Sequence, residues 1–144
     1  MNKSRHTGKS NPIDRDAGGF VALPWSVIDS PAYRGLSMHA RAVLLELARQ
    51  FVRDNNGRLL LSMNYMRTRG WNSASMLAKA KKELLESGFI FETVKGHRPN
   101  KASWYAITWH GLEKLKGYDE GTEKCYVRSA YLRLQPAKIN GLNP

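Results

Sequence analysis

The sequence predicts an α+β fold that is mostly helical, and three observations support this. The chain has 144 residues, 42% of them hydrophobic, which suffices for one core but not for two substantial domains. Apolar residues recur at helical spacing as far as residue 87. Two β-prone runs follow, separated by seven residues that include Gly, Pro and Asn. We therefore expect helices first and a β-hairpin after them.

Composition divides the chain into three parts. Residues 1–19 carry four basic side chains amid Ser, Asn, Pro and Gly, which predicts a flexible basic arm. Residues 20–116 contain the apolar periodicity and are expected to form the domain. Residues 117–144 hold only scattered apolar groups, so we expect a tail that docks a short helix at most.

Proline and serine mark the first short helix. Pro24 suits a first helical position, which predicts a helix over residues 24–29. The pair Ser30-Pro31 then breaks this helix, because the residue before a proline disfavours helical backbone angles.

A longer helix is predicted over residues 37–53. Ser37 is a good N-cap, and six apolar residues between Ala40 and Phe51 repeat at helical spacing. The Asp, Asn and Gly residues at 54–57 predict the turn that ends this helix.

Two further helices follow with little chain between them. Residues 58–61 predict a small strand, and residues 62–68 predict a brief helix with a serine cap. Gly70 ends this helix, and Asn72 or Ser73 begins the next one. Two helices separated by so tight a turn form a helix-turn-helix unit.

Two β-prone runs, residues 89–95 and 103–109, predict a hairpin whose basic tip is formed by residues 96–102. Residues 110–116 are expected to add a closing helix. The order helix, strand, helix, turn, helix, hairpin is that of a winged helix-turn-helix. The predicted fold is therefore α+β, mostly α, a winged helix-turn-helix with a C-terminal β-hairpin wing.

The formal net charge of +11 is large enough to attract polyanions, and nucleic acid is the first partner to consider. A membrane surface is disfavoured, because no stretch combines a basic face with a bare apolar face. Neither a signal peptide nor an apolar run long enough to span a membrane is visible. With Cys125 as the one cysteine, no internal disulfide forms, and a cytoplasmic location is expected.

The helix over residues 72–87 has two different faces. On a helical wheel, Leu77, Ala80 and Leu84 share the side expected to face the core. A recognition helix enters the major groove with its N-terminal residues nearest the base edges. We therefore expect four polar side chains to read bases, namely Asn72, Ser73, Ser75 and Lys79.

Other basic residues are placed to contact the DNA backbone. Lys82 lies one turn farther along the helix, and Arg67 and Arg69 precede it. The hairpin tip is expected to reach a minor groove or a flanking phosphate with His97, Arg98, Asn100 and Lys101.

A simpler interpretation of these charges stays open. Lys79 and Lys82 have Glu83 and Glu86 four residues on, so the lysines could merely form a solvated face of paired charges. The hairpin tip is equally compatible with an ordinary polar loop.

No pattern in the chain predicts catalysis or metal binding. Gly8-Lys9-Ser10 lacks the glycine that a phosphate-binding loop needs five residues earlier. The four histidines and Cys125 have no ligand spacing, and Asp119, Glu120 and Glu123 form an acidic cluster expected to be solvated. We therefore expect no enzyme, no cofactor and no metal ion.

The predicted helix over residues 37–53 carries a second apolar surface. Met38, Leu45 and Val52 form a stripe about 130 degrees from the centre of the core face. Packing by the N-terminal or C-terminal segment is slightly favoured as its cover over a two-fold dimer contact.

The run from Phe20 to Leu115 resembles the winged-helix proteins of phages, prophages and plasmids, which act as replication initiators or regulators. The resemblance rests on VALPWSVIDSPAYRGLS, LLELARQF, NGRLLLS, GWNSASMLAKAKKELLESGFI and RPNKASWYAITW. It implies duplex DNA as the partner, with recognition positions falling on Asn72 to Lys82.

The sequence thus favours a sequence-selective double-stranded DNA-binding protein, a mobile-element regulator of transcription or replication. The alternative is a winged helix that binds a protein, such as a phage accessory protein that inhibits a host nucleic-acid-binding complex.

Overall fold

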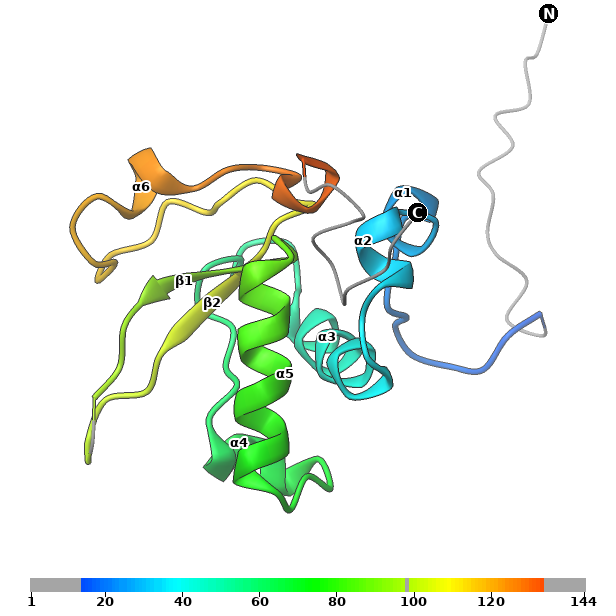
Figure 1. Ribbon diagram of the computed structural model, residues 1–144, viewed down its shortest axis with the longest axis horizontal. Helices are drawn as coiled ribbons and strands as arrows, with labels where there is room; N and C mark the ends of the chain where they lie inside the picture. The colour runs from blue at the N-terminus through cyan, green and yellow to red at the C-terminus, as the bar shows by residue number, and fades with distance from the viewer. Residues whose placement is uncertain (1–13, 98, 134–144) are drawn as a thin grey trace, which may run out of the picture.

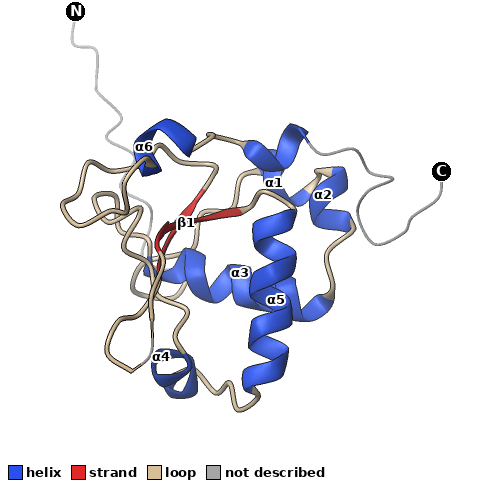
Figure 2. Cartoon of the chain, turned by 60° about the vertical axis from the view of Figure 1, so that its left-hand side comes forward, coloured by secondary structure: helices blue, strands red, loops and turns tan. Residues whose placement is uncertain are grey.

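The computed structural model describes residues 14–97 and 99–133, which have a mixed α and β structure that is mostly helical (Figure 1, Figure 2). This is compatible with the predicted α+β class. In chain order the elements are α1 (Trp25–Ile28), α2 (Pro31–Arg34), α3 (Met38–Gln50), α4 (Met63–Thr68), α5 (Ala74–Glu86), β1 (Ile90–Val94), β2 (Trp104–Ile107), α6 (Thr122–Cys125) and the 3-10 helix η1 (Ala130–Arg133).

Serine side chains begin four of these helices. In each case the hydroxyl accepts a hydrogen bond from the backbone N–H three residues later, which satisfies an otherwise unpaired donor of the first turn. The caps of α3 and α4 were predicted, whereas α2 was not, because Ser30 both follows α1 and caps a new helix. The capping serines are Ser30, Ser37, Ser62 and Ser73.

Helix α3 packs against α5 and forms the centre of the core. Helix α3 buries Val43, Leu44 and Leu47 there. Helix α5 contributes the face that the helical wheel predicted, Leu77, Ala80 and Leu84, all at most 2% exposed. The core face of α5 is thereby fixed, and its opposite face is turned outward.

The predicted helix over residues 37–53 ends earlier, at Gln50. Phe51 adopts an extended conformation. The Asn55 side chain forms hydrogen bonds with backbone groups at the end of the helix. Its amide nitrogen donates to the Gln50 carbonyl at 2.8 Å, and its oxygen accepts from the Val52 N–H at 2.9 Å. Asparagine side chains compete with helical hydrogen bonds in this way.

The predicted strand over residues 58–61 is present only as a single antiparallel bridge, in which Leu59 and Tyr105 exchange two backbone hydrogen bonds of 3.0 and 2.9 Å. The backbone groups of the next residue, Leu60, form hydrogen bonds with the Gln50 side chain. The Gln50 amide donates to the Leu60 carbonyl at 2.7 Å and accepts from its N–H at 2.8 Å. The hairpin was predicted correctly, with β1 and β2 antiparallel and Ile90 opposite Ile107.

The predicted closing helix over residues 110–116 is wrong, because this segment has no regular secondary structure and ends in a turn at Lys116. Its backbone groups bond to distant partners rather than to each other. The Gly111 carbonyl accepts from the Asn56 side chain, and the Glu113 N–H donates to the Asn56 carbonyl. The Glu113 carbonyl accepts from the Tyr118 hydroxyl.

The described part of the tail packs on the domain, through α6 and η1. Tyr131 is buried and its ring stacks on Phe89 with centroids 4.9 Å apart. Gly88 permits this contact, because a Cβ there would lie 2.8 Å from the backbone of Ala130. Residues 1–13 of the predicted arm and residues 134–144 of the tail lie outside the described residues.

Asn56 ties the turn after α3 to the end of the hairpin. It is 1% exposed. Its side-chain oxygen accepts from the Ile107 N–H at 2.9 Å, and its amide nitrogen donates to the carbonyls of Ile107 at 3.1 Å and Gly111 at 2.8 Å. No sequence signal beyond a turn pointed to this residue.

Within residues 14–97 and 99–133, no helix is both long and apolar enough to cross a membrane.

We expect Asn56→Ala to lower the free energy of unfolding by about 3 kcal/mol, because it leaves the buried Ile107 N–H without a partner and removes a hydrogen bond from the carbonyls of Ile107 and Gly111. Urea unfolding followed by circular dichroism measures this. The matched control is Asn64→Ala on α4, whose side chain is exposed and which should change stability by less than about 0.5 kcal/mol. Equal effects of the two substitutions would contradict the role of Asn56.

Candidate nucleic-acid interface

Helix α4, the N-terminal end of α5 and the tip of the hairpin lie at one end of the molecule. Figure 1 and Figure 2 both show them at the bottom of the view, with α6 and η1 at the opposite end. Of the predicted base-reading and backbone-contacting residues that the structure describes, all belong to these elements or adjoin them except Lys79 and Lys82, which lie farther along α5. The fold therefore brings the end of α4, the start of α5 and the hairpin tip to one end of the protein.

The turn between α4 and α5 is held by backbone hydrogen bonds. The N–H groups of Arg69 and Trp71 both donate to the Met66 carbonyl, at 2.9 and 3.0 Å. Gly70 has a φ of +91°, a conformation that side chains rarely adopt. Trp71 packs against the core, and Asn72 directly after it is exposed.

The outward face of α5 carries the predicted polar residues, with one exception. Asn72, Ser75 and Lys79 are exposed, as expected. The Ser73 hydroxyl is used as the N-cap, accepting from the Met76 N–H at 3.2 Å, and it lies 3.2 Å from the Ser75 hydroxyl. Ser73 thus has a structural role, whereas the other three side chains face solvent.

Glu83 does not pair with Lys79 as the solvated-face interpretation requires. Its carboxylate instead accepts from the backbone N–H of Ser37 at 2.6 Å and from the Ser37 hydroxyl at 2.7 Å. This fixes α5 to the N-terminus of α3, where a carboxylate is favoured. Lys79 therefore has no ion pair in the described part of the chain.

Lys82 does pair with Glu86, as the same interpretation expects. The Lys82 Nζ and Glu86 Oε1 atoms are 3.9 Å apart, and both side chains are largely exposed. Such an exposed ion pair contributes little to stability, so Lys82 can exchange Glu86 for another anion.

The two arginines before α5 differ in their surroundings. The Arg69 Nε donates to Glu46 on α3 at 2.7 Å, and this hydrogen bond raises the pKa of the guanidinium. Arg69 thereby links the turn to α3. Arg67 is exposed at the end of α4 and makes no ion pair among residues 14–97 and 99–133.

The hairpin tip is closed by two backbone hydrogen bonds between His97 and Lys101, of 2.8 and 3.0 Å. Gly96 allows the strands to approach, because a Cβ there would lie 2.4 Å from the backbone of Lys101. The side chains of His97, Asn100 and Lys101 are exposed. Arg98, also predicted at this tip, lies outside the described residues.

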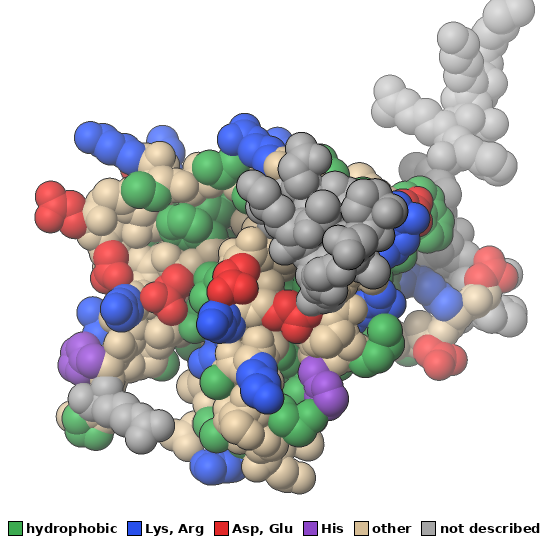
Figure 3. All heavy atoms as spheres, in the orientation of Figure 1, with side chains coloured by type: hydrophobic (Ala, Val, Ile, Leu, Met, Phe, Trp, Pro, Cys, Tyr) green, Lys and Arg blue, Asp and Glu red, His purple; other side chains and the backbone are tan. Residues whose placement is uncertain are grey.

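A cleft of about 630 Å³ separates α5 from the hairpin tip. Figure 3 shows the outline of the molecule notched here, with basic side chains over both elements. None of the residues that line the cleft is acidic. Those from the helices are Ser62, Met63, Asn64, Ala74, Leu77, Ala78 and Lys81, and those from the hairpin are Gly96, His97, Pro99, Asn100, Lys101, Ala102 and Ser103.

Lys81 is a candidate residue that sequence analysis missed. It is half-buried, and burial lowers the pKa of its ammonium group while the charge of Glu92 opposes that shift. On the helical wheel Lys81 lies about 40 degrees from Leu77, among the core residues. The sequence does carry a signal for Lys81, because a lysine on the apolar side of an amphipathic helix is unusual.

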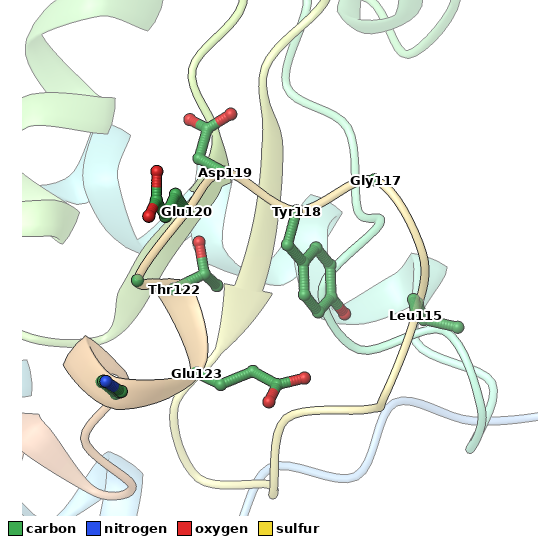
Figure 4. Close-up of a pocket in the computed structure, with 9 residues that line it drawn as sticks. Leu115, Gly117, Tyr118, Asp119, Glu120, Thr122 and Glu123 are labelled. Atoms are coloured by element: carbon green, nitrogen blue, oxygen red, sulfur yellow. The ribbon is translucent and has the colours of Figure 1, made fainter.

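A second pocket, of about 480 Å³, is lined by the acidic loop between β2 and α6 (Figure 4). In Figure 4 the Glu123 carboxylate points away from those of Asp119 and Glu120. Asp119 accepts from the Lys95 N–H at 2.7 Å, which holds this loop to the hairpin. Among the described residues, no group of His, Cys, Asp or Glu side chains is placed to hold a metal ion.

The residues of the predicted apolar stripe remain exposed, but only Met38 and Leu45 lie on α3, because the helix ends at Gln50 and Val52 follows it. Met38, Leu45 and Val52 are 67%, 48% and 62% exposed. Phe20 and Val21 lie beside Val52, but no other segment of residues 14–97 and 99–133 supplies the predicted cover.

Comparisons with known proteins give no family for this chain. Scans of protein-family models, curated proteins and solved structures each find no significant match.

We expect Glu83→Ala to lower the free energy of unfolding by about 1 kcal/mol, because Ser37 loses the carboxylate that accepts its N–H and hydroxyl. Glu86→Ala removes the same charge from the exposed face of α5 and should change stability by less than about 0.5 kcal/mol. Chemical unfolding of both variants measures the difference. A larger loss for Glu86→Ala would contradict this role of Glu83.

Proposed function

We propose that this protein is a winged helix-turn-helix protein that binds double-stranded DNA with sequence preference. Helices α4 and α5 with the turn at Gly70 would form the helix-turn-helix, and the β1–β2 hairpin would form the wing. One observation carries the proposal. The N-terminal end of α5 lies at the same end of the molecule as the basic hairpin tip, and the outward face of this helix carries Lys79, which has no ion pair among the described residues.

Helix α5 has the length and surface that a recognition helix needs. Its 13 residues span about 20 Å, which suits the major groove of duplex DNA. Asn72 and Ser75 stand at its N-terminal end, nearest the base edges in the usual docking geometry. Asparagine pairs with adenine through two hydrogen bonds, and Lys79 suits the acceptors of guanine.

Contacts to the DNA backbone would come from both sides of α5. Arg67 precedes the helix and Lys101 lies on the hairpin tip, and both are exposed. Lys82 would exchange its weak pairing with Glu86 for a phosphate oxygen. Such contacts give affinity for any sequence, whereas the residues at the start of α5 provide the preference among sequences.

The biological role that we propose is regulation of transcription or replication in a mobile element, in the cytoplasm. The resemblance of residues 20–115 to winged-helix proteins of phages and plasmids supports it. The protein would act by occupying a DNA site rather than by catalysis.

Binding to a protein is a second candidate function, favoured by the exposed stripe of Met38, Leu45 and Val52. The partner would be a second copy of the chain or a host or phage protein. A light-scattering mass identifies a dimer. A stoichiometric partner that survives nuclease and moderate salt would favour protein binding over DNA binding.

We expect Asn72→Ala to relax the preference at one base position, and Lys79→Ala to weaken binding of the preferred duplex about tenfold. The preferred duplex is obtained by selection from a random pool, and fluorescence anisotropy gives the affinities. Lys114→Ala, which removes an exposed lysine outside the interface, is the control and should bind normally. Unmeasurable binding of mixed duplexes at low salt would overturn the proposed function.

A further inference from the structure

The cleft between α5 and the hairpin tip suggests a ligand contact distinct from base reading. We propose that this cleft binds the sugar-phosphate backbone of one DNA strand, with a phosphate held by Lys81. This inference rests on the proposed duplex binding and assigns a part of that site which sequence analysis passed over.

The shape of the cleft suits an extended chain. On the α5 side, Ala74 and Ala78 are one turn apart, and their small side chains leave room. The opposite wall is the hairpin tip, from Pro99 to Ser103. A volume of about 630 Å³ that opens to solvent is larger than one inorganic ion needs and accommodates a segment of nucleic acid backbone.

The charges of the cleft favour an anion. Lys81 stands on the helix wall, and Lys101 and His97 stand on the hairpin wall. No acidic residue is among those that line it, while Asn64 and Asn100 add neutral hydrogen-bonding groups. A phosphate chain between the two walls would therefore meet a cation on each side.

Lys81 differs from the exposed lysines of α5 in its surroundings. It is half-buried and has no carboxylate within ion-pair distance in the described part of the chain. Burial lowers the pKa of its ammonium group, which reflects the loss of hydration of the charge. A partly dehydrated cation is attracted by an anion more strongly than a fully hydrated one, so a phosphate here compensates for the water that folding removes.

The position of Lys81 also agrees with the proposed docking of α5. Lys79 is exposed on the outward face of the helix, whereas Lys81 faces the hairpin. When α5 lies in one groove and the hairpin tip reaches the next, the DNA strand between the two grooves passes between these elements. Lys81 lies on that path.

The test compares Lys81→Met with Lys124→Met, an exposed lysine of α6 at the far end of the molecule. Methionine retains an unbranched stem and removes the charge. We expect Lys81→Met to weaken binding of every duplex about tenfold and to reduce the salt slope of log K by about 0.9, the value for one phosphate contact. Lys124→Met should bind like the wild type.

Thermal unfolding of the same variants separates binding from folding. We expect Lys81→Met to unfold at the wild-type temperature or above it, because it no longer buries part of a charge. If this variant unfolds at a lower temperature, Lys81→Arg decides the question, since it keeps the charge. Retained duplex affinity of that variant would support the inference, and lost affinity would overturn it.

Two outcomes distinguish this inference from the proposed function. If the wild type binds duplexes and Lys81→Met binds them equally tightly with the same salt slope, the phosphate contact is wrong and duplex binding stands. If the wild type binds no duplex at low salt, both proposals are overturned.

Discussion

The buried hydrogen bonds of Asn56 hold together parts of the chain that no local signal connects. Its side chain binds both backbone groups of Ile107, 51 residues away, and the carbonyl of Gly111. Because Ile107 ends β2, these bonds fix the returning strand of the hairpin against the turn that follows α3. The base of the hairpin is anchored in this way, since without Asn56 the Ile107 N–H would be buried without a partner.

Helix α5 serves a different purpose on each of its sides. Leu77 and Leu84 bury the inner side in the core, and Glu83 joins the helix to the N-terminus of α3. Lys79 lies outward and Lys81 lies toward the hairpin. Since Glu83 bonds to Ser37, it does not neutralise Lys79, and the contact that positions the helix also leaves its outward charge available to a ligand.

The features that could be predicted from the sequence are those determined by neighbouring residues. Serine caps, the buried face of α5 and the two strands of the hairpin depend on spacing within one segment. Two errors are local, the missed serine cap of α2 and the early end of α3 at the Asn55 side chain, and the others depend on contacts between segments. In the predicted strand over residues 58–61 only Leu59 pairs with β2, and Asn56 and Tyr118 bond to residues 111–113 in place of a closing helix.

In the candidate site, too, the sequence predicts what depends on one segment and misses what depends on packing between segments. The wheel placed Ser75 and Lys79 outward correctly, but the pairing of Arg69 with Glu46 and the cleft beside Lys81 require the packing of separate elements. Lys81 was visible as a lysine on the apolar side of α5, although only the position of the hairpin shows what it faces.

The most direct test of the proposed interface is to titrate the ¹⁵N-labelled protein with a selected duplex and to map the changes in amide chemical shift. We expect the largest changes over residues 72–82 and 95–103, with little change at α6 and at the exposed stripe of Met38, Leu45 and Val52. Changes concentrated at α6 or on that stripe, with α5 and the hairpin tip unaffected, would contradict the proposed DNA-binding face.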